Sequence, residues 1–179
     1  SGLVLAGADA GNYSVSAALG LSVNISPRLL TAAWVGVDKV YDGTALAQVA
    51  GTSADIVAGD VLSIIGSGSF VAGKNAGTGK AIAVSGGTLL GADAANYRLA
   101  NAEGSTTASI LQKLITPTYT GGTRVYDGGT QAPVTLGSVG LVAGDDVSIG
   151  QTAQFTGAGA KNVGSGKAVS VENITLAGA

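Results

Sequence analysis

The sequence predicts an all-β protein built of small tandem modules, and three observations lead to this prediction. Tyr41-Asp42-Gly43 recurs 85 residues later as Tyr126-Asp127-Gly128. Several segments alternate apolar and polar residues with period 2, which is typical of strands with one buried face. The 30 glycines, and the absence of capped segments with apolar residues at i, i+3 and i+4, leave room for no more than a single helical turn, near 91–94.

Short strands separated by Gly, Asn and Asp turns favour small β-sandwich modules of immunoglobulin-like architecture, stacked end to end. β-grasp-like modules are the alternative, which the lack of a helix weakens. Hydrophobic residues make up 46% of the chain but aromatic residues only 4%. We therefore expect a thin core of Val, Leu, Ile and Ala.

Further paired segments divide the chain into units. They follow the same order in each copy: Ala58-Gly59-Asp60 with Ala143-Gly144-Asp145, Lys74-Asn75 with Lys161-Asn162, and Asn96-Tyr97 with Asn12-Tyr13. The Lys-Asn pair has a spacing of 87 because two residues are inserted after Phe155. We predict tail strands of a preceding repeat in 1–26, a complete unit in 27–111, and in 112–179 an incomplete unit that lacks its last strands.

The clearest alternation runs through residues 13–26, where Tyr13, Leu21, Val23 and Ile25 share one face. We expect residues 1–26 to supply edge strands, either to the incomplete unit or to a neighbouring molecule in its place. The pairs Ile82 with Val84, Val147 with Ile149, and Val169 with Val171 show the same alternation. The phase slips between Val171 and Ile174, which predicts a bulge or a tight bend.

The repeated Tyr-Asp-Gly predicts a turn in each unit. Gly43 and Gly128 would supply a positive φ, while the carboxylates of Asp42 and Asp127 would accept hydrogen bonds from nearby backbone amides. The rings of Tyr41 and Tyr126 would be buried with their hydroxyls near water or a carbonyl. We regard these residues, with Asn96 and Tyr97, as structural motifs; a ligand contact is the alternative.

Four motifs follow one another along the chain: Lys39-Val40-Tyr41-Asp42-Gly43-Thr44, Gly59-Asp60, Lys74 to Lys80 and Gly91 to Tyr97. In these motifs the chain resembles the YDG-type repeats of large bacterial surface adhesins and filamentous haemagglutinin-like exoproteins. It implies a protein that is secreted to the bacterial cell surface or extracellular matrix, in which many units form a stalk or filament. It supplies no catalytic residues.

Several kinds of chemistry are excluded or disfavoured. The chain has no Cys, His or Met, so it lacks a Ser-His or Cys-His nucleophile pair and an ordinary zinc site. The glycines before Lys80 and Lys167 do not fit a phosphate loop, which needs a Gly six residues before its Lys and a Ser or Thr after it. We expect no catalytic, cofactor or metal site. Calcium at a unit junction, with Asp60, Asp145 or Asp146, is kept as an alternative.

The expected partners follow from charge and repetition. Charged residues make up only 11% of the chain and form no basic cluster, so we expect no nucleic-acid partner and no membrane insertion. Trp34 is read as a core or junction aromatic. We therefore expect a structural spacer without enzymatic activity that contacts neighbouring repeats and holds an adhesive region away from the cell or contributes to a biofilm matrix. The alternative is a module that itself binds a polysaccharide or a host surface protein.

Overall fold

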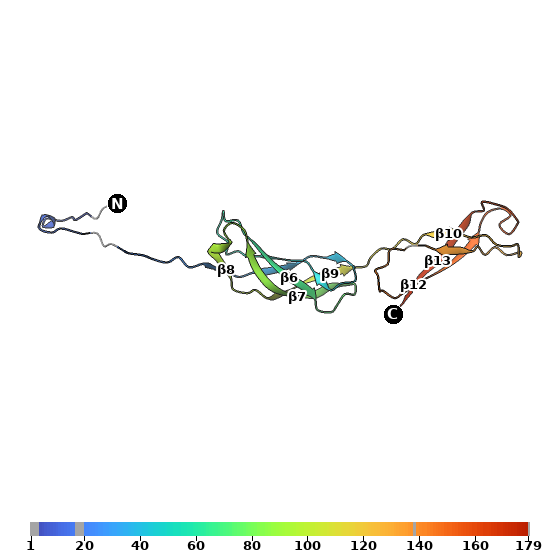
Figure 1. The fold of residues 1–179 in the computed structure, drawn as a ribbon, viewed down its shortest axis with the longest axis horizontal. Coiled ribbons are helices and arrows are strands. Elements are labelled where there is room, and N and C mark those ends of the chain that lie inside the picture. The colour runs from blue at the N-terminus through green and yellow to red at the C-terminus, as the bar shows by residue number, and fades with distance from the viewer. Residues whose placement is uncertain (1–3, 17–19, 138, 179) are drawn as a thin grey trace.

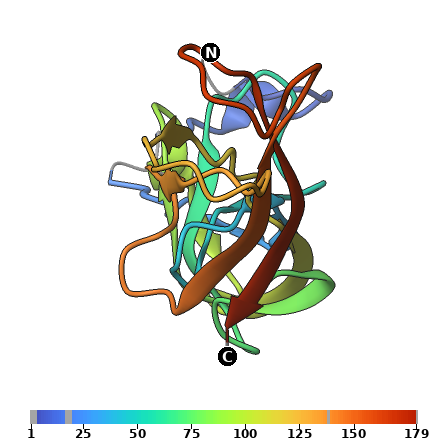
Figure 2. The ribbon, with the colours of Figure 1, turned by 90° about the vertical axis from the view of Figure 1, so that its right-hand side faces the viewer.

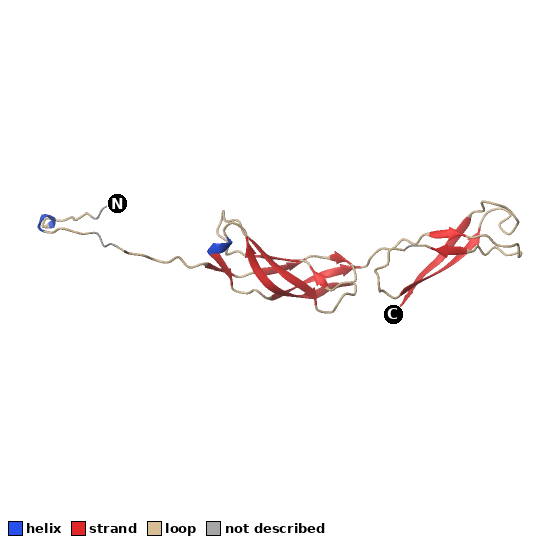
Figure 3. Ribbon diagram, in the orientation of Figure 1, coloured by secondary structure: helices blue, strands red, loops and turns tan. Residues whose placement is uncertain are grey.

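The computed structural model describes residues 4–16, 20–137 and 139–178. The protein is all-β, as predicted, with two three-residue 3-10 turns, η1 (Ala10–Asn12) and η2 (Ala94–Asn96). None of the helical turns in this part of the chain has the length or apolar character of a membrane-spanning helix. Two β units lie one after the other along the long axis of the molecule, and the residues before β1 extend from the first unit on the side away from the second unit (Figures 1 and 3).

We call residues 27–111 the first unit and 112–178 the second unit. The strands of the first unit are β1 (Arg28–Leu30), β2 (Ala33–Gly36), β3 (Lys39–Val40), β4 (Leu46–Ala47), β5 (Val49–Thr52), β6 (Ser63–Phe70), β7 (Gly77–Leu90), β8 (Tyr97–Leu99) and β9 (Gly104–Leu111). Seven of them form one curled sheet in the order β2-β5-β6-β7-β9-β3, with β4 also paired to β6. Strands β1 and β8 form a separate parallel pair.

The second unit repeats the central hairpins of the first. Its strands are β10 (Tyr119–Gly121), β11 (Val134–Leu136), β12 (Val147–Phe155) and β13 (Val169–Gly178). The antiparallel pairs β10-β11 and β12-β13 correspond to β2-β5 and β6-β7, and an isolated bridge between Gln131 and Gln154 of β12 corresponds to the pairing of β4 with β6. Viewed along the long axis, the two units overlap in projection (Figure 2).

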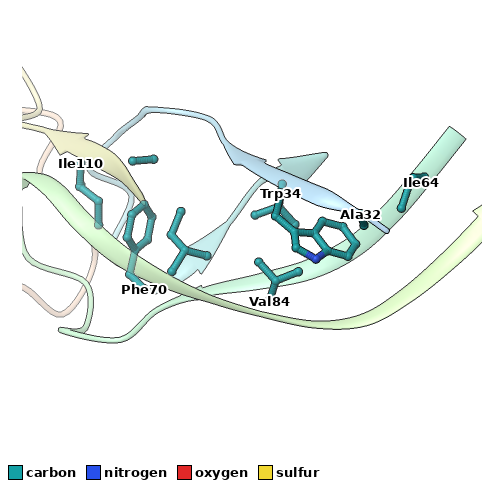
Figure 4. Close-up of a cluster of buried hydrophobic side chains, with 9 residues drawn as sticks. Ala32, Trp34, Ile64, Phe70, Val84 and Ile110 are labelled. Carbon is teal, nitrogen blue, oxygen red and sulfur yellow. The ribbon is translucent and has the colours of Figure 1, made fainter. Parts of the chain in front are cut away.

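The core of the first unit is small and mainly aliphatic. It consists of nine buried residues, six of them labelled in Figure 4: Ala32, Trp34, Val49, Ile64, Phe70, Ile82, Val84, Ala108 and Ile110. The alternation predicted for Ile82 and Val84 is confirmed, since both are buried while their neighbours in β7 are exposed. Trp34 also lies in this core, as one of the two sequence readings expected.

Glycines make the room that Trp34 occupies. A Cβ added at Gly66 or Gly87 would lie 3.0 Å from the indole, and one at Gly104 would lie 2.5 Å from Cδ1. The second unit has Tyr119 in place of Trp34. There, larger residues replace three glycines that contact the indole: Leu136 for Gly51, Gln151 for Gly66 and Ile174 for Gly87. The smaller central aromatic of the second unit is thus accompanied by larger neighbouring side chains, whereas the larger Trp34 of the first unit is surrounded by glycines.

The predicted irregularity after Val171 is confirmed as a β-bulge. Asn173 and Ile174 together oppose Gln151, because Gly150 pairs with Thr175 and Thr152 with Glu172. The first unit has a bulge at the equivalent place, where Gly86 and Gly87 oppose Gly66. Since a bulge bends its strand and increases the local twist, the paired bulges account for the curl of both hairpins.

Residues 13–16 and 20–26, where strands are expected, form no strand, and residues 17–19 of the same segment lie outside the described residues. Among the described residues before β1, only the turn η1 is regular, and no strand pairs there. Leu21, Val23 and Ile25 are 88%, 84% and 98% exposed. The alternation is present in the sequence, but a strand requires a neighbour for its backbone hydrogen bonds, and the second unit lies at the opposite end of the molecule (Figure 1). Pairing with the chain's own second unit was therefore wrong.

Candidate functional site at the junction of the two units

The first Tyr-Asp-Gly segment forms a tight turn held by one carboxylate oxygen. Oδ1 of Asp42 accepts hydrogen bonds from the backbone N–H of Thr44 at 2.9 Å and from its hydroxyl at 2.9 Å. Gly43 has a φ of 81°, a conformation that glycine adopts without steric cost. Lys39 completes the turn: its ammonium donates to Asp42 at 2.8 Å and to the carbonyl of Thr44 at 2.9 Å.

These contacts lower the pKa of Asp42 to about 2. The hydrogen bond from Lys39 is the largest cause, followed by the bonds from Thr44, because each favours the charged carboxylate. The turn is therefore held by a carboxylate that stays ionised under ordinary conditions.

The second Tyr-Asp-Gly segment has the same construction with a different base. The backbone N–H of Gly129 donates to Oδ1 of Asp127 at 2.8 Å, and Gly128 has a φ of 81°. Arg124 donates to Oδ2 of Asp127 at 2.6 Å and to the carbonyl of Gly129. The sequence analysis missed the roles of Lys39 and Arg124, although a base three residues before the Asp in both copies was a usable signal.

The same bases lie over the aromatic residue at the end of the central hairpin. The ammonium of Lys39 is 5.8 Å from the ring centre of Phe70, and that of Lys80 is 5.7 Å from it. Arg124 is 5.5 Å from the ring of Phe155. Lys80 also donates to the carbonyl of Gly73 at 2.8 Å. The glycine-rich loop thus uses its lysine to bind its own backbone.

Tyr97 organises the opposite end of the first unit. Asn96 ends the turn η2, and Tyr97, which is only 6% exposed, begins β8. The hydroxyl of Tyr97 donates to Oδ2 of Asp60 and accepts the backbone N–H of Val57 at 3.1 Å. The pKa of Tyr97 is raised above 10.0 because its proton is bound to Asp60 and because burial disfavours the phenolate.

The junction between the units is centred on Asp145. Its Oδ1 accepts hydrogen bonds from the hydroxyl of Tyr41 at 2.8 Å and from the ammonium of Lys74 at 2.8 Å. The ammonium of Lys74 also lies 5.8 Å from the ring centre of Tyr41. Asp145 belongs to the second unit, and its two partners come from different loops of the first. One carboxylate therefore connects two units across 104 residues of sequence.

This contact favours the charged forms of both Asp145 and Lys74. Hydrogen bonds from Lys74 and then Tyr41 lower the pKa of Asp145 below 3.8. The hydrogen bond to Asp145 raises the pKa of Lys74 above 10.5. The Lys74 side chain is 46% exposed and that of Asp145 only 16%, so solvent and salt screen the ion pair in part.

Close packing accompanies the polar contact. A Cβ at Gly43 would lie 2.6 Å from Cγ1 of Val142, so the glycine of the first turn lets the loop of the second unit approach. An open groove of about 920 Å³ follows the junction. It is lined by Tyr41 and 74–76 of the first unit, the connecting segment 112–115, and 141–142, 144–147 and Leu176 of the second unit.

The structure places the predicted motif residues at three locations. Tyr41, Asp42 and Gly43 lie at the junction, whereas Asn96 and Tyr97 lie at the other end of the first unit. Tyr126, Asp127 and Gly128 form the corresponding turn of the second unit, beside a groove of about 540 Å³ that also includes Lys161. The sequence analysis recognised Lys74 only as part of a repeated segment, and Asp145 as part of a repeated segment and as an alternative calcium ligand at a junction. Nothing in the sequence indicated that these two residues meet.

The position considered for calcium holds an ammonium group. Oδ1 of Asp145 binds Lys74, and Asp60 binds Tyr97. Within 4–16, 20–137 and 139–178, no group of three or more acidic side chains converges on one point.

The fold and the junction define a protein of tandem β units connected by specific contacts between successive units. The family model of the YDG domain matches residues 26–108 and, a second time, residues 111–179. The chain therefore belongs to the YDG domain family and contains two matches to it. Searches of curated proteins and of solved structures found no match.

Proposed function

We propose that this chain is part of the stalk of a secreted bacterial adhesin, in which sandwich-like YDG units stack end to end as spacers. The contact of Asp145 with Tyr41 and Lys74 is the observation that carries the proposal. A spacer must hold its two ends a fixed distance apart, and it does so only if successive units keep their relative orientation. The carboxylate and its two donors come from opposite sides of the junction, so they restrict bending there.

The connection between the units supports the same role. Residues 112–118 link β9 to β10 and contain Pro117, whose ring limits φ. Part of this connection, 112–115, lines the junction groove, where Ile115 is half-buried and Leu114 is exposed. A Gly/Ser linker would let the units move independently.

Length would then increase with the number of units. Strand β12 has nine residues and spans about 30 Å at roughly 3.3 Å per residue. Because the strands run along the chain of units (Figure 3), each additional repeat would lengthen the stalk by a similar amount. The adhesive target would be contacted by another region of the parent protein.

Small-angle X-ray scattering on the intact chain tests this proposal. We expect an elongated particle at neutral pH. Asp145→Ala should broaden the distribution of interatomic distances and reduce the maximum dimension, because the second unit becomes free to swing. Asp146→Ala is the matched control: Asp146 is adjacent and exposed, and should leave the profile unchanged. A compact wild-type particle, or equal profiles for the two variants, would refute the spacer role.

A further inference from the structure

The two donors of the junction come from two separate loops of the first unit. Tyr41 lies in the turn that follows β3, and Lys74 lies in the loop between β6 and β7. Both donate to the same atom, Oδ1 of Asp145, each at 2.8 Å. Because two loops must reach one oxygen, the position of each loop relative to the other decides whether the contact forms.

Lys39 holds the first of these loops. Its ammonium donates to Oδ1 of Asp42 at 2.8 Å, to the carbonyl of Thr44 at 2.9 Å and to the hydroxyl of Thr44 at 3.0 Å. These bonds close the turn around Gly43, the residue that Val142 of the second unit approaches most closely. Lys39 therefore fixes the surface on which the second unit packs.

Lys80 holds the second loop. Its ammonium donates to the carbonyl of Gly73 at 2.8 Å and to the carbonyl of Asn75. These two residues lie on either side of Lys74. Lys80 thus fixes the stretch of backbone from which the side chain of Lys74 extends to Asp145.

Phe70 connects the two loops to each other. It is 2% exposed, and the ammonium groups of Lys39 and Lys80 lie 5.8 Å and 5.7 Å from its ring centre (Figure 4), within the range of a cation–π interaction. Its backbone N–H donates to the carbonyl of Ala45 at 2.8 Å, directly after the turn, and its carbonyl accepts the N–H of Gly73 at 3.1 Å. One buried residue therefore ties both loops to the core.

We propose that Lys39 and Lys80 are positioning residues of the junction, which hold two loops against Phe70 as a preformed site for the carboxylate of the following unit. Neither lysine makes a hydrogen bond or an ion pair with a described residue of the second unit, so both act through the loops. The inference rests on the proposed spacer role, because it explains how the same junction is kept rigid.

The backbone alone gives the Tyr-Asp-Gly turn little support. Strands β3 and β4, which flank this turn, have two residues each, so few ladder hydrogen bonds fix its position. The side chain of Lys39 is only 19% exposed, so water and salt screen its contacts less than those of a surface ion pair. We therefore expect loss of either lysine to free a donor loop without removing the donor itself.

Distances between spin labels in the full chain test the proposal. Because the chain has no native cysteine, labels can be attached at Ser67→Cys on β6 and Thr135→Cys on β11, two exposed positions. We expect Lys39→Met and Lys80→Met each to widen the distance distribution about twofold, because each weakens the contact without deleting it. A distribution that stays narrow in either variant would overturn the proposal.

The second unit supplies matched controls. Arg124 and Lys167 are the counterparts of Lys39 and Lys80, at spacings of 85 and 87. Arg124→Met and Lys167→Met should leave the distribution unchanged, because these residues belong to the other unit's turn and loop. Widening equal to that of the first-unit variants would show a general loss of stability, and would also overturn the proposal.

A conservative variant separates positioning from folding. Lys39→Arg should keep the distribution narrow, because Arg124 makes the same contacts with Asp127 and Gly129. Fluorescence of Trp34 shows whether the first unit is folded in each variant. Where a methionine variant unfolds this unit, glutamine at the same position takes its place, with the same expected widening.

The pKa of Asp145 provides a readout that a purely structural role would not move. Hydrogen bonds from Lys74 and Tyr41 lower this pKa below 3.8. If the lysines position these donors, Lys39→Met and Lys80→Met should raise the pKa of Asp145 toward 3.8 in a carbon-detected NMR titration. A pKa that keeps its wild-type value in both variants would contradict the positioning role.

Asp145→Ala in the same labelled chain distinguishes this inference from the spacer role. A distribution that stays narrow in Asp145→Ala would count against the spacer role itself. A distribution that widens in Asp145→Ala, but not in Lys39→Met or Lys80→Met, would leave the spacer role intact and refute the positioning role of the two lysines.

Discussion

Asn173 has a φ of 54° at the position where Gly86, its counterpart in the first unit, has a φ of 66°. Each residue is the first of the two that bulge from their strand. Asn173 is the one non-glycine residue at positive φ in the described part of the chain. Asn tolerates this region better than most residues, and its side-chain amide donates to the hydroxyl of Thr152 at 3.0 Å. The bulge therefore demands a left-handed conformation in both units.

Substitution of Gly86 should show the cost of this conformation. We expect Gly86→Ala to lower the free energy of unfolding by about 1–2 kcal/mol, the penalty of a left-handed L-residue, and Gly86→Asn to lower it by less. Urea denaturation followed by tryptophan fluorescence measures the effect, because Trp34, the only tryptophan, reports on the first unit. Equal losses for Ala and Asn would show that the strand adapts its bulge.

The glycines around Trp34 should tolerate no side chain. In Gly104→Ala the new methyl group would lie 2.5 Å from Cδ1 of Trp34, so we expect a loss of about 1–3 kcal/mol from overpacking. Gly77→Ala is the control in the same sheet, since its Cβ would be 3.4 Å from Cδ of Lys80, and it should change stability by less than about 0.5 kcal/mol. Fluorescence-detected denaturation compares them, and similar losses would argue against a tightly packed indole.

The sequence predicted those features of the fold that depend on the local pattern of apolar and polar residues. Period-2 alternation predicted the all-β class and the burial of Ile82 and Val84, and a slip in the same pattern located the bulge near Asn173. These features are readable because side chains alternate regularly across a strand. For residues 13–26 the alternation predicts which side chains share one face, but it does not identify the strand with which they pair.

The junction could not be predicted in the same way. The repeat spacing showed that Asp145 corresponds to Asp60, but the two carboxylates bind different groups, Asp145 through Oδ1 and Asp60 through Oδ2. Which donors reach them depends on how one unit sits on the next. That arrangement arises from long-range packing and leaves no periodic signal in the sequence.

The pKa of Asp42 should depend on Lys39. We expect the carboxyl to titrate at about 2 in the wild type, and Lys39→Met to raise this pKa toward 3.8, since Lys39 is the largest cause of the shift. The contribution of the Asp42 carboxylate to the stability of the turn is complete above pH 3.8 and is lost as the pH falls through about 2. Carbon-detected NMR titration measures the value, and Lys161→Met should leave it unchanged.

The junction should be stiff over a wide pH range and loosen at both ends of it. The pKa of Asp145 is lower in the folded protein. The contribution of Asp145 to the stability of the junction is therefore complete above pH 3.8 and is lost as the pH falls through the lowered value. The pKa of Lys74 is raised, so its contribution to the stability of the junction is complete below pH 10.5 and is lost as the pH rises through the raised value.

A spin label attached to an introduced cysteine in each unit gives the distribution of distances between the units. We expect it to be narrow at neutral pH and to broaden outside these limits, and to broaden with added salt, which screens the partly exposed ion pair. In Asp145→Asn the distribution should already be broad at neutral pH and insensitive to salt; a narrow, pH-independent distribution in that variant would show that Val142 and the connecting segment hold the units without the carboxylate.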